Sequence, residues 1–163
     1  EKISKLPLSA NAYPLTEVQR RMLLLEHQTP GAYNLPLKLV LAPSICLNKL
    51  NDAFRQVLRR HSVLCTAYSD FTSGSLRNNW ADSFMIERGD VENQNAFAAR
   101  PFDLSVEPSL RALYVATSNE LILVGHHIVI DGWCIGKIVD EAIQFYNGTQ
   151  ENAPQFLYQD YAF

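Results

Sequence analysis

The sequence has little cysteine, no long apolar run and no cluster of positive charge. Its three cysteines, Cys46, Cys65 and Cys134, have unrelated spacings, which argues against a disulfide framework and indicates thiols in a reducing compartment. No apolar stretch reaches the roughly 18 residues of a membrane-spanning helix, and the first residues lack the apolar core of a signal peptide. We therefore expect a soluble, cytoplasmic protein that does not bind membranes.

Charge excludes another class of partner. The chain has 14 Lys and Arg against 17 Asp and Glu, a formal net charge of -3. Basic residues adjoin one another only in the pairs Arg20 and Arg21, and Arg59 and Arg60. Proteins that bind nucleic acid need a positively charged surface, so we expect no nucleic acid partner. What the sequence does have is 47% hydrophobic residues over 163 positions, enough for one domain with a real core.

The spacing of apolar residues predicts alternating helices and strands. Thr16 and Gln19 have the form of a capping box, which predicts a helix over residues 17–28. Further helices are predicted at residues 47–61 and 91–100, and a last one from residue 133 to the closing Asn147 and Gly148. Strands are predicted at residues 35–41, 63–71, 76–80, 84–87, 110–115 and 120–124, with a turn at 73–75. This mixture predicts a two-layer α/β (α+β) sandwich.

The most informative segment reads HHIVIDGW, residues 126–133, and follows the apolar run at 121–125. Two histidines, an aspartate and a glycine therefore gather where a buried strand emerges into a turn. Imidazole has an ordinary pKa of about 6.5, so it can accept a proton near neutral pH, and a strand end holds it in place. The segment contains a candidate catalytic base.

Two other interpretations of the histidine pair remain open on residue types alone. Buried histidines often serve as hydrogen-bonded core residues. As metal ligands, the segment offers only a mixed set without CxxC or HExxH spacing: His126, His127, Asp131 and Cys134. We therefore expect no bound metal.

Residues 126–132 match the HHxxxDG signature of the condensation domains of nonribosomal peptide synthetases. Three more segments resemble motifs of the same family, in the family's order. They read YPLTEVQRRM at residues 13–22, RRHSVLCT at 59–66 and RPFDL at 100–104, the last followed by Pro108, Leu110 and Arg111. The signature alone is shared with chloramphenicol acetyltransferase and other acyltransferases, but four ordered motifs favour a condensation domain.

The resemblance implies a chloramphenicol acetyltransferase-like lobe with a mixed sheet flanked by helices. It also implies an acyltransferase of antibiotic biosynthesis that forms an amide bond between two substrates. An upstream peptidyl carrier protein presents the donor thioester on phosphopantetheine, and a downstream carrier presents an aminoacyl thioester whose amine attacks. The phosphopantetheine arms arrive with these carriers, so no cofactor is expected on the chain itself.

The resemblance also implies roles for individual residues. His127 orients or deprotonates the attacking amine, and Gly132 allows close approach and offers its N–H to the developing oxyanion. Asp131 either pairs with an arginine, which would lock the turn, or caps the helix that follows. Three residues are expected to support the site: His126, Trp133 and Arg111. Whether Arg60 and His61 face the site or only end their helix stays open.

Two features depart from the family. Cys65 stands where the family's second motif has an arginine, and Arg111 is a possible replacement for it. Condensation domains also have two similar lobes, whereas residues 1–163 correspond to the first lobe alone. We therefore expect the isolated chain to be inactive, with an apolar tail at residues 158–163 that favours self-association. The alternatives are a small-molecule acyltransferase completed by oligomerisation, and a non-catalytic module that docks carrier proteins.

Overall fold

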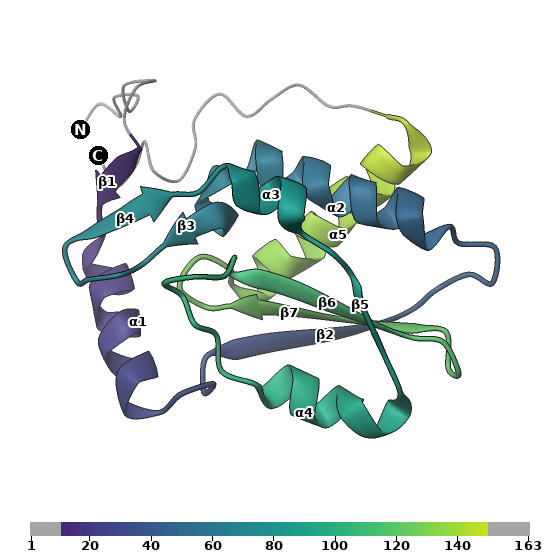
Figure 1. Ribbon diagram of the computed structural model, residues 1–163, viewed down its shortest axis with the longest axis horizontal. Coiled ribbons are helices and arrows are strands. Elements are labelled where there is room, and N and C mark those ends of the chain that lie inside the picture. The colour runs from purple at the N-terminus through teal and green to yellow at the C-terminus, as the bar shows by residue number, and fades with distance from the viewer. Residues whose placement is uncertain (1–10, 150–163) are drawn as a thin grey trace.

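The computed structural model describes residues 11–149, in which two sheets have helices packed around them (Figure 1). The larger sheet has the strand order β2-β7-β6-β5, and it is mixed because β5 runs parallel to β6 whereas the other pairs are antiparallel. Its strands are β2 (Asn34–Val40), β5 (Glu87–Gly89), β6 (Leu110–Val115) and β7 (Glu120–His126). The smaller sheet, β1-β4-β3, consists of β1 (Ala12–Pro14), β3 (Thr66–Ala67) and β4 (Ser73–Leu76).

Helices cover both faces of the larger sheet. In Figure 1, α2 and α5 lie together above it and α4 lies below it. The five α-helices of the described residues are α1 (Glu17–Gln28), α2 (Leu47–Arg60), α3 (Asn79–Ser83), α4 (Gln94–Ala99) and α5 (Gly132–Asn147). Short 3-10 helices occupy Ser62–Cys65 and Val91–Asn93. The predicted α/β class is confirmed, and none of the helices in residues 11–149 is long and apolar enough to cross a bilayer.

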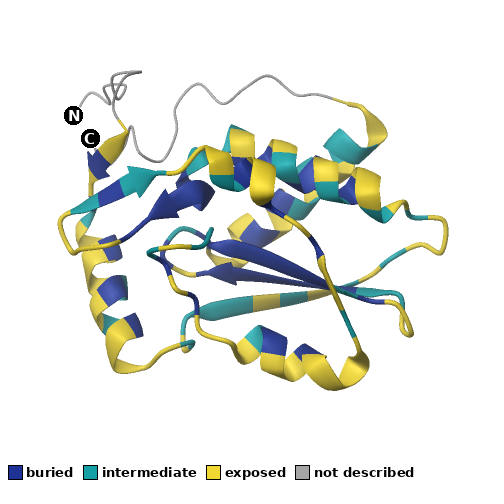
Figure 2. Ribbon diagram, in the orientation of Figure 1, coloured by how far each residue is buried: buried dark blue, intermediate teal, exposed yellow. Residues whose placement is uncertain are grey.

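Strand β7 is buried on both faces of the sheet, as its dark blue ribbon in Figure 2 indicates. Leu121 and Leu123 pack into the core beneath α2 and α5. Ile122 and Val124 pack into a second core on the opposite face, with residues from α1 and α4. Full burial of such a side chain contributes about 1.5–3 kcal/mol each. Both cores therefore fix β7, and with it the position of the histidines at its end.

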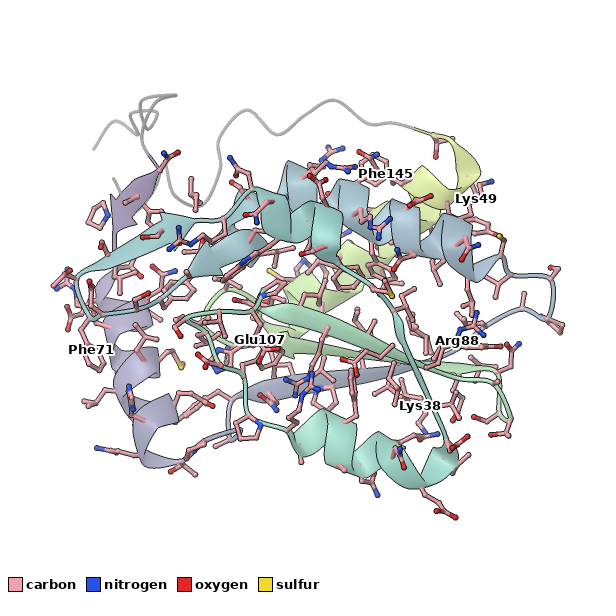
Figure 3. All side chains as sticks on the ribbon, in the orientation of Figure 1. Lys38, Lys49, Phe71, Arg88, Glu107 and Phe145 are labelled. Carbon is pink, nitrogen blue, oxygen red and sulfur yellow. The ribbon has the colours of Figure 1, made fainter. Side chains whose placement is uncertain are left out.

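A capping box begins α1, and the segment that joins β3 to β4 contacts this helix. The predicted capping box is present: the Gln19 N–H donates to Thr16 Oγ1, and the Thr16 N–H donates to Gln19 Oε1, each at 3.2 Å. The Gln19 amide is fully buried and also donates to the Tyr68 hydroxyl at 3.2 Å. Phe71, labelled in Figure 3, lies beside the same helix with its ring centroid 5.8 Å from that of His27.

Predictions for residues 63–80 were largely wrong. The 63–71 segment begins as a 3-10 helix and forms only the two-residue β3, and 76–80 runs from the end of β4 into α3. The expected turn at 73–75 is strand β4 instead, because Gly74 allows a close approach between chain segments. A Cβ there would lie 2.7 Å from Thr66 Cγ2 and 3.1 Å from the Tyr13 ring. The hairpin of β6 and β7, and the helices at 17–28 and 47–61, are confirmed within one or two residues.

The capping box gives a stability prediction. Thr16→Ala removes the acceptor for the Gln19 N–H, so the free energy of unfolding should fall by about 1 kcal/mol in equilibrium urea denaturation. Val18→Ala is the matched control, because Val18 is 63% exposed on the same helix and should change the value by less than about 0.5 kcal/mol. Equal effects of the two substitutions would contradict the capping role.

Candidate active site

The histidine pair lies at the end of β7 and is held from both neighbouring strands. The His126 N–H donates to the Ser109 carbonyl, next to β6, and the His127 N–H donates to the Tyr33 carbonyl, next to β2, both at 3.0 Å. The chain then turns tightly, with the Ile130 N–H donating to the His126 carbonyl at 3.1 Å. These bonds fix the backbone on both sides of the turn.

His127 has an exposed ring whose protonation pattern is set by one contact. Its Nδ1 lies 3.0 Å from the Ile130 carbonyl oxygen. A carbonyl oxygen can only accept, so Nδ1 must carry the hydrogen. In the neutral ring Nε2 then has the free lone pair, which is the form that a general base requires.

The turn can fold against the strand because residue 125 is glycine. A Cβ on Gly125 would lie 2.6 Å from Ile130 Cδ1 and 3.4 Å from its Cβ. Since these distances are shorter than or at the limit of ordinary contacts, a larger residue would displace Ile130. Its carbonyl is the group that orients the His127 ring, so the glycine contributes to the geometry of the site.

His126 is a fully buried residue and faces away from solvent. Its Nδ1 accepts the Ile128 N–H at 3.1 Å, and its Nε2 lies 3.2 Å from Glu26 Oε2. The Phe102 ring meets it edge to face at a centroid distance of 5.6 Å. Burial lowers the pKa of His126, although the nearby Glu26 acts in the opposite direction. Because Nδ1 accepts a hydrogen bond, it carries no hydrogen, and the ring is in a neutral form.

Asp131 caps α5. Its Oδ1 accepts the Cys134 N–H at 2.7 Å, and this backbone hydrogen bond lowers the pKa of the carboxyl group. The alternative, an ion pair with an arginine, is not found: Asp131 is exposed and has no ion pair within the described residues. Gly132 begins α5, and a Cβ there would meet nothing within 4 Å. Trp133, which was expected to support the site, is 76% exposed.

Arg111 lies behind His126, in the second core. Its guanidinium donates to the carbonyls of Phe97 and Arg100 and lies 3.9 Å from the centroid of the Phe102 ring. Burial, followed by the charge of Arg100, lowers the pKa of Arg111 to about 10. Arg111 therefore supports the packing around His126 and does not supply the missing partner of Asp131.

Cys65 is a core residue. It is 1% exposed, and burial raises the pKa of its thiol to about 12, so it stays protonated.

His61 ends α2 and lies beside α5: its Nε2 is 2.7 Å from Glu141 Oε2, and Arg60 Nε is 3.7 Å from the same oxygen. His61 also borders a hollow of about 150 Å³ behind the turn, together with Ile130. Arg60 and His61 thus both contact α5 through Glu141, and His61 also adjoins the turn.

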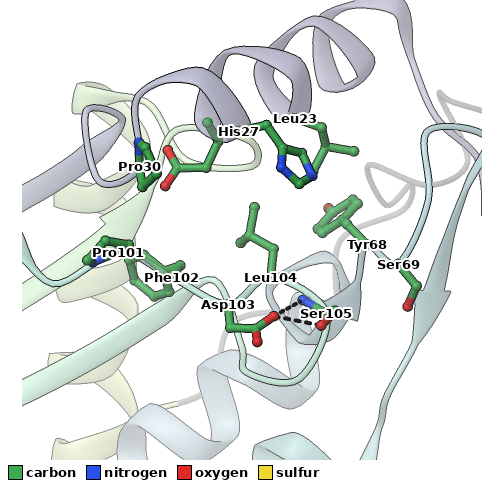
Figure 4. A pocket seen from close by; sticks show the side chains of 11 residues that line it. Leu23, His27, Pro30, Tyr68, Ser69, Pro101, Phe102, Asp103, Leu104 and Ser105 are labelled. Carbon is green, nitrogen blue, oxygen red and sulfur yellow. Dashed lines mark hydrogen bonds between the residues drawn. The ribbon is translucent and has the colours of Figure 1, made fainter.

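A larger hollow of about 490 Å³ lies between α1 and the segment that follows α4 (Figure 4). Leu23, His27 and Tyr68 line one part of it, and Phe102 and Leu104 line another. Glu26 also lines this hollow, and it was not predicted from the sequence as a site residue. The available signal was spacing: Glu26 falls on the same face of the predicted helix as Leu23 and Gln19, and a carboxylate on a buried face is rarely without a partner. In residues 11–149 no group of three or more His, Cys, Asp or Glu is arranged to hold a metal ion.

Comparison with known proteins identifies the family. Residues 9–163 match the family model described as Condensation domain. This chain belongs to the condensation domain family. A plipastatin synthase protein of Bacillus subtilis (strain 168) is 33% identical over 162 residues, covering 92% of the chain and 6% of that protein. Tyrocidine synthase 3 of Brevibacillus parabrevis is 30% identical over the same length, covering 92% of the chain and 2% of that synthase. The chain thus spans only a small part of the length of these relatives.

Solved structures share the fold. The EpoB cyclization-docking bidomain from Sorangium cellulosum superposes with a TM-score of 0.82 at 20% identity, over 99% of this chain and 36% of that one. The X-domain in complex with OxyB from teicoplanin biosynthesis gives 0.81 at 19% identity, over 97% and 38%. The predicted mixed sheet flanked by helices is therefore confirmed as the fold of this family.

The helix cap at Asp131 can be tested by its pH dependence. The lowered pKa means that the ionised carboxylate stabilises the fold above its unfolded pKa, and that this stability is lost as pH falls through the lowered value. Asp131→Ala should therefore lower the melting temperature near neutral pH, and the difference from wild type should shrink below roughly pH 4. Asp131→Asn, whose amide oxygen can still accept the Cys134 N–H, is the control and should melt closer to wild type. A pH-independent difference would contradict a charge effect.

Proposed function

We propose that this chain is the catalytic, histidine-bearing lobe of a peptide-bond-forming condensation domain. The observation that supports the proposal is the contact between His127 Nδ1 and the Ile130 carbonyl, which leaves Nε2 as an exposed lone-pair nitrogen at a rigid strand end. Family membership supplies the reaction class, acyl transfer from a thioester to an amine.

In the proposed reaction the amine of the acceptor attacks the carbonyl carbon of the donor thioester. The C–N bond forms, the C–S bond breaks, and Nε2 of His127 accepts the proton from the amine and passes it to the departing sulfur. Alignment of two tethered substrates is worth up to about 7–11 kcal/mol, whereas one base contributes roughly 10²–10⁴-fold. Gly132 leaves open space beside His127's turn, and its N–H at the start of α5 is a candidate donor to the oxyanion.

The partners follow from the same proposal. Upstream and downstream peptidyl carrier proteins deliver the donor and the acceptor on phosphopantetheine, and a second lobe completes the cleft. Two observations support an incomplete cleft: the chain spans 36% to 38% of the related solved chains, and Trp133 is 76% exposed next to the site. A side chain of that size contributes most when a partner covers it.

A docking module is the second candidate function, because a domain of this fold occurs in complex with OxyB. Replacing His127 separates the two functions, since a docking module needs no base at position 127. The third alternative is a small-molecule acyltransferase completed by oligomerisation. The acceptor distinguishes it from a condensation domain, because it would use a free amine or alcohol and not a carrier-bound thioester.

The main test replaces His127 in the full-length protein that contains this chain. His127→Ala should reduce amide formation between loaded carrier proteins by roughly 10–10⁴-fold, the lower end applying if positioning dominates. Intact-protein mass spectrometry of the carriers gives the readout. His27→Ala is the matched control, because His27 is another exposed histidine and lies on α1. A folded His127→Ala variant with undiminished amide formation would remove the assignment.

Activity of the isolated 163-residue chain gives a second test. We expect it to make no amide bonds and to associate with a second copy or with its missing lobe, because covering apolar surface contributes about 25 cal/mol per Å². The predicted apolar tail at residues 158–163 lies outside the described residues. Analytical ultracentrifugation combined with the carrier assay tests this expectation, and a monomeric chain with normal activity would contradict it.

A further inference from the structure

Glu26 connects two chain segments that meet at the active site. It lies on α1, is 8% exposed, and places its two carboxyl oxygens on different partners. Oε1 accepts the Gly31 N–H at 2.7 Å, and Oε2 lies 3.2 Å from His126 Nε2. Both of these atoms are buried, and neither has a well-aligned hydrogen bond within the described residues, so their 3.2 Å approach is the close polar contact that the structure gives them.

The hydrogen on His126 must lie on the nitrogen that faces Glu26. The Ile128 N–H donates to His126 Nδ1, so Nδ1 cannot carry a hydrogen itself. The neutral ring has one N–H group, which must then be at Nε2. Both oxygens of Glu26 therefore face N–H donors.

These two donors belong to the segments that hold the backbone of His127. The Gly31 N–H lies in the turn before β2, and two residues later the Tyr33 carbonyl accepts the His127 N–H. His126 and Ile128, on the other side, are the sequence neighbours of His127. Gly31 has φ of +81°, and a Cβ there would lie 2.8 Å from the Ala99 carbonyl oxygen. The backbone at Gly31 is thus closely packed against the residue before Arg100, so this turn has little room to move.

We propose that Glu26 is a positioning residue for acyl transfer: through Gly31 and His126 it fixes the backbone that aims His127. The inference rests on the proposed function of His127. It assigns to α1 a part in the reaction that does not require contact with substrate.

The geometry requires a carboxylate at this position. A glutamine has the same shape but only one acceptor oxygen, so it can satisfy Gly31 or His126 and not both. If its oxygen accepts from Gly31, its NH₂ group faces the Nε2–H of His126, donor against donor. If the hydrogen of His126 moved to Nδ1, Nε2 could accept from the glutamine NH₂ group, but Nδ1–H would then face the Ile128 N–H, again donor against donor.

The experiment uses the full-length protein and places Glu26→Gln in two backgrounds, wild type and His127→Ala. In the wild-type background kcat for amide formation should fall about 10- to 100-fold with little change in KM, because small misplacements of a reacting group have costs of this size. In the His127→Ala background the same substitution should change kcat by less than about twofold, since the group that Glu26 positions is already gone. Glu17→Gln is the matched control, because Glu17 lies on the same helix with an exposed side chain paired to Arg20.

Two outcomes overturn the inference: unchanged kcat in Glu26→Gln, or an equal loss in both backgrounds, which a merely structural role would produce. Should Glu26→Gln fail to fold, His126→Asn tests the same contact from the other side. Its amide oxygen is a possible acceptor for the Ile128 N–H while the contact with Glu26 is lost, and wild-type kcat in this variant would overturn the inference. The proposed function fails separately, through undiminished activity of His127→Ala alone.

Discussion

The site depends on the double-sided burial of β7. Its alternate residues pack into two different cores, and it pairs with β2 on one edge and with β6 on the other. A strand held on four sides has little freedom at its end, so the backbone of His126 and His127 is placed by the packing of the whole sheet. An exposed imidazole on such a backbone can be both accessible and oriented, which are the two properties that a base needs.

The two histidines have opposite environments although they are adjacent in sequence. Successive residues at a strand end point to opposite sides, so His126 enters the second core while His127 faces solvent. The buried ring accepts at Nδ1 and the exposed ring donates from Nδ1, so each must have a different tautomer. The pair is thus one buried anchor and one reactive group, and the anchor continues through Glu26 to α1.

The sequence predicted those parts of the fold that local patterns determine. The capping box at Thr16 and the paired apolar runs of β6 and β7 are local signals, and both gave correct elements. Residues 63–80 were misjudged because β3 and β4 are short and depend on the approach of Gly74 to Tyr13, a contact between distant segments. The candidate site was predictable at His127 through its motif, but the bond to Ile130 that sets its tautomer is a property of the folded turn.

The surroundings of Arg111 are a second feature that the sequence could not predict, because they depend on the folded sheet. As the cation that follows the third motif it was a reasonable partner for Asp131, but β6 directs it into the second core, where backbone carbonyls and the Phe102 ring surround it. Asp131, free of an arginine, accepts from the helix that it caps. With Cys65 buried and protonated, the described part of the chain holds the turn through backbone hydrogen bonds and a helix cap and not through an ion pair. Backbone bonds keep their geometry without a compensating charge, so the described residues are sufficient to form the turn that carries His127.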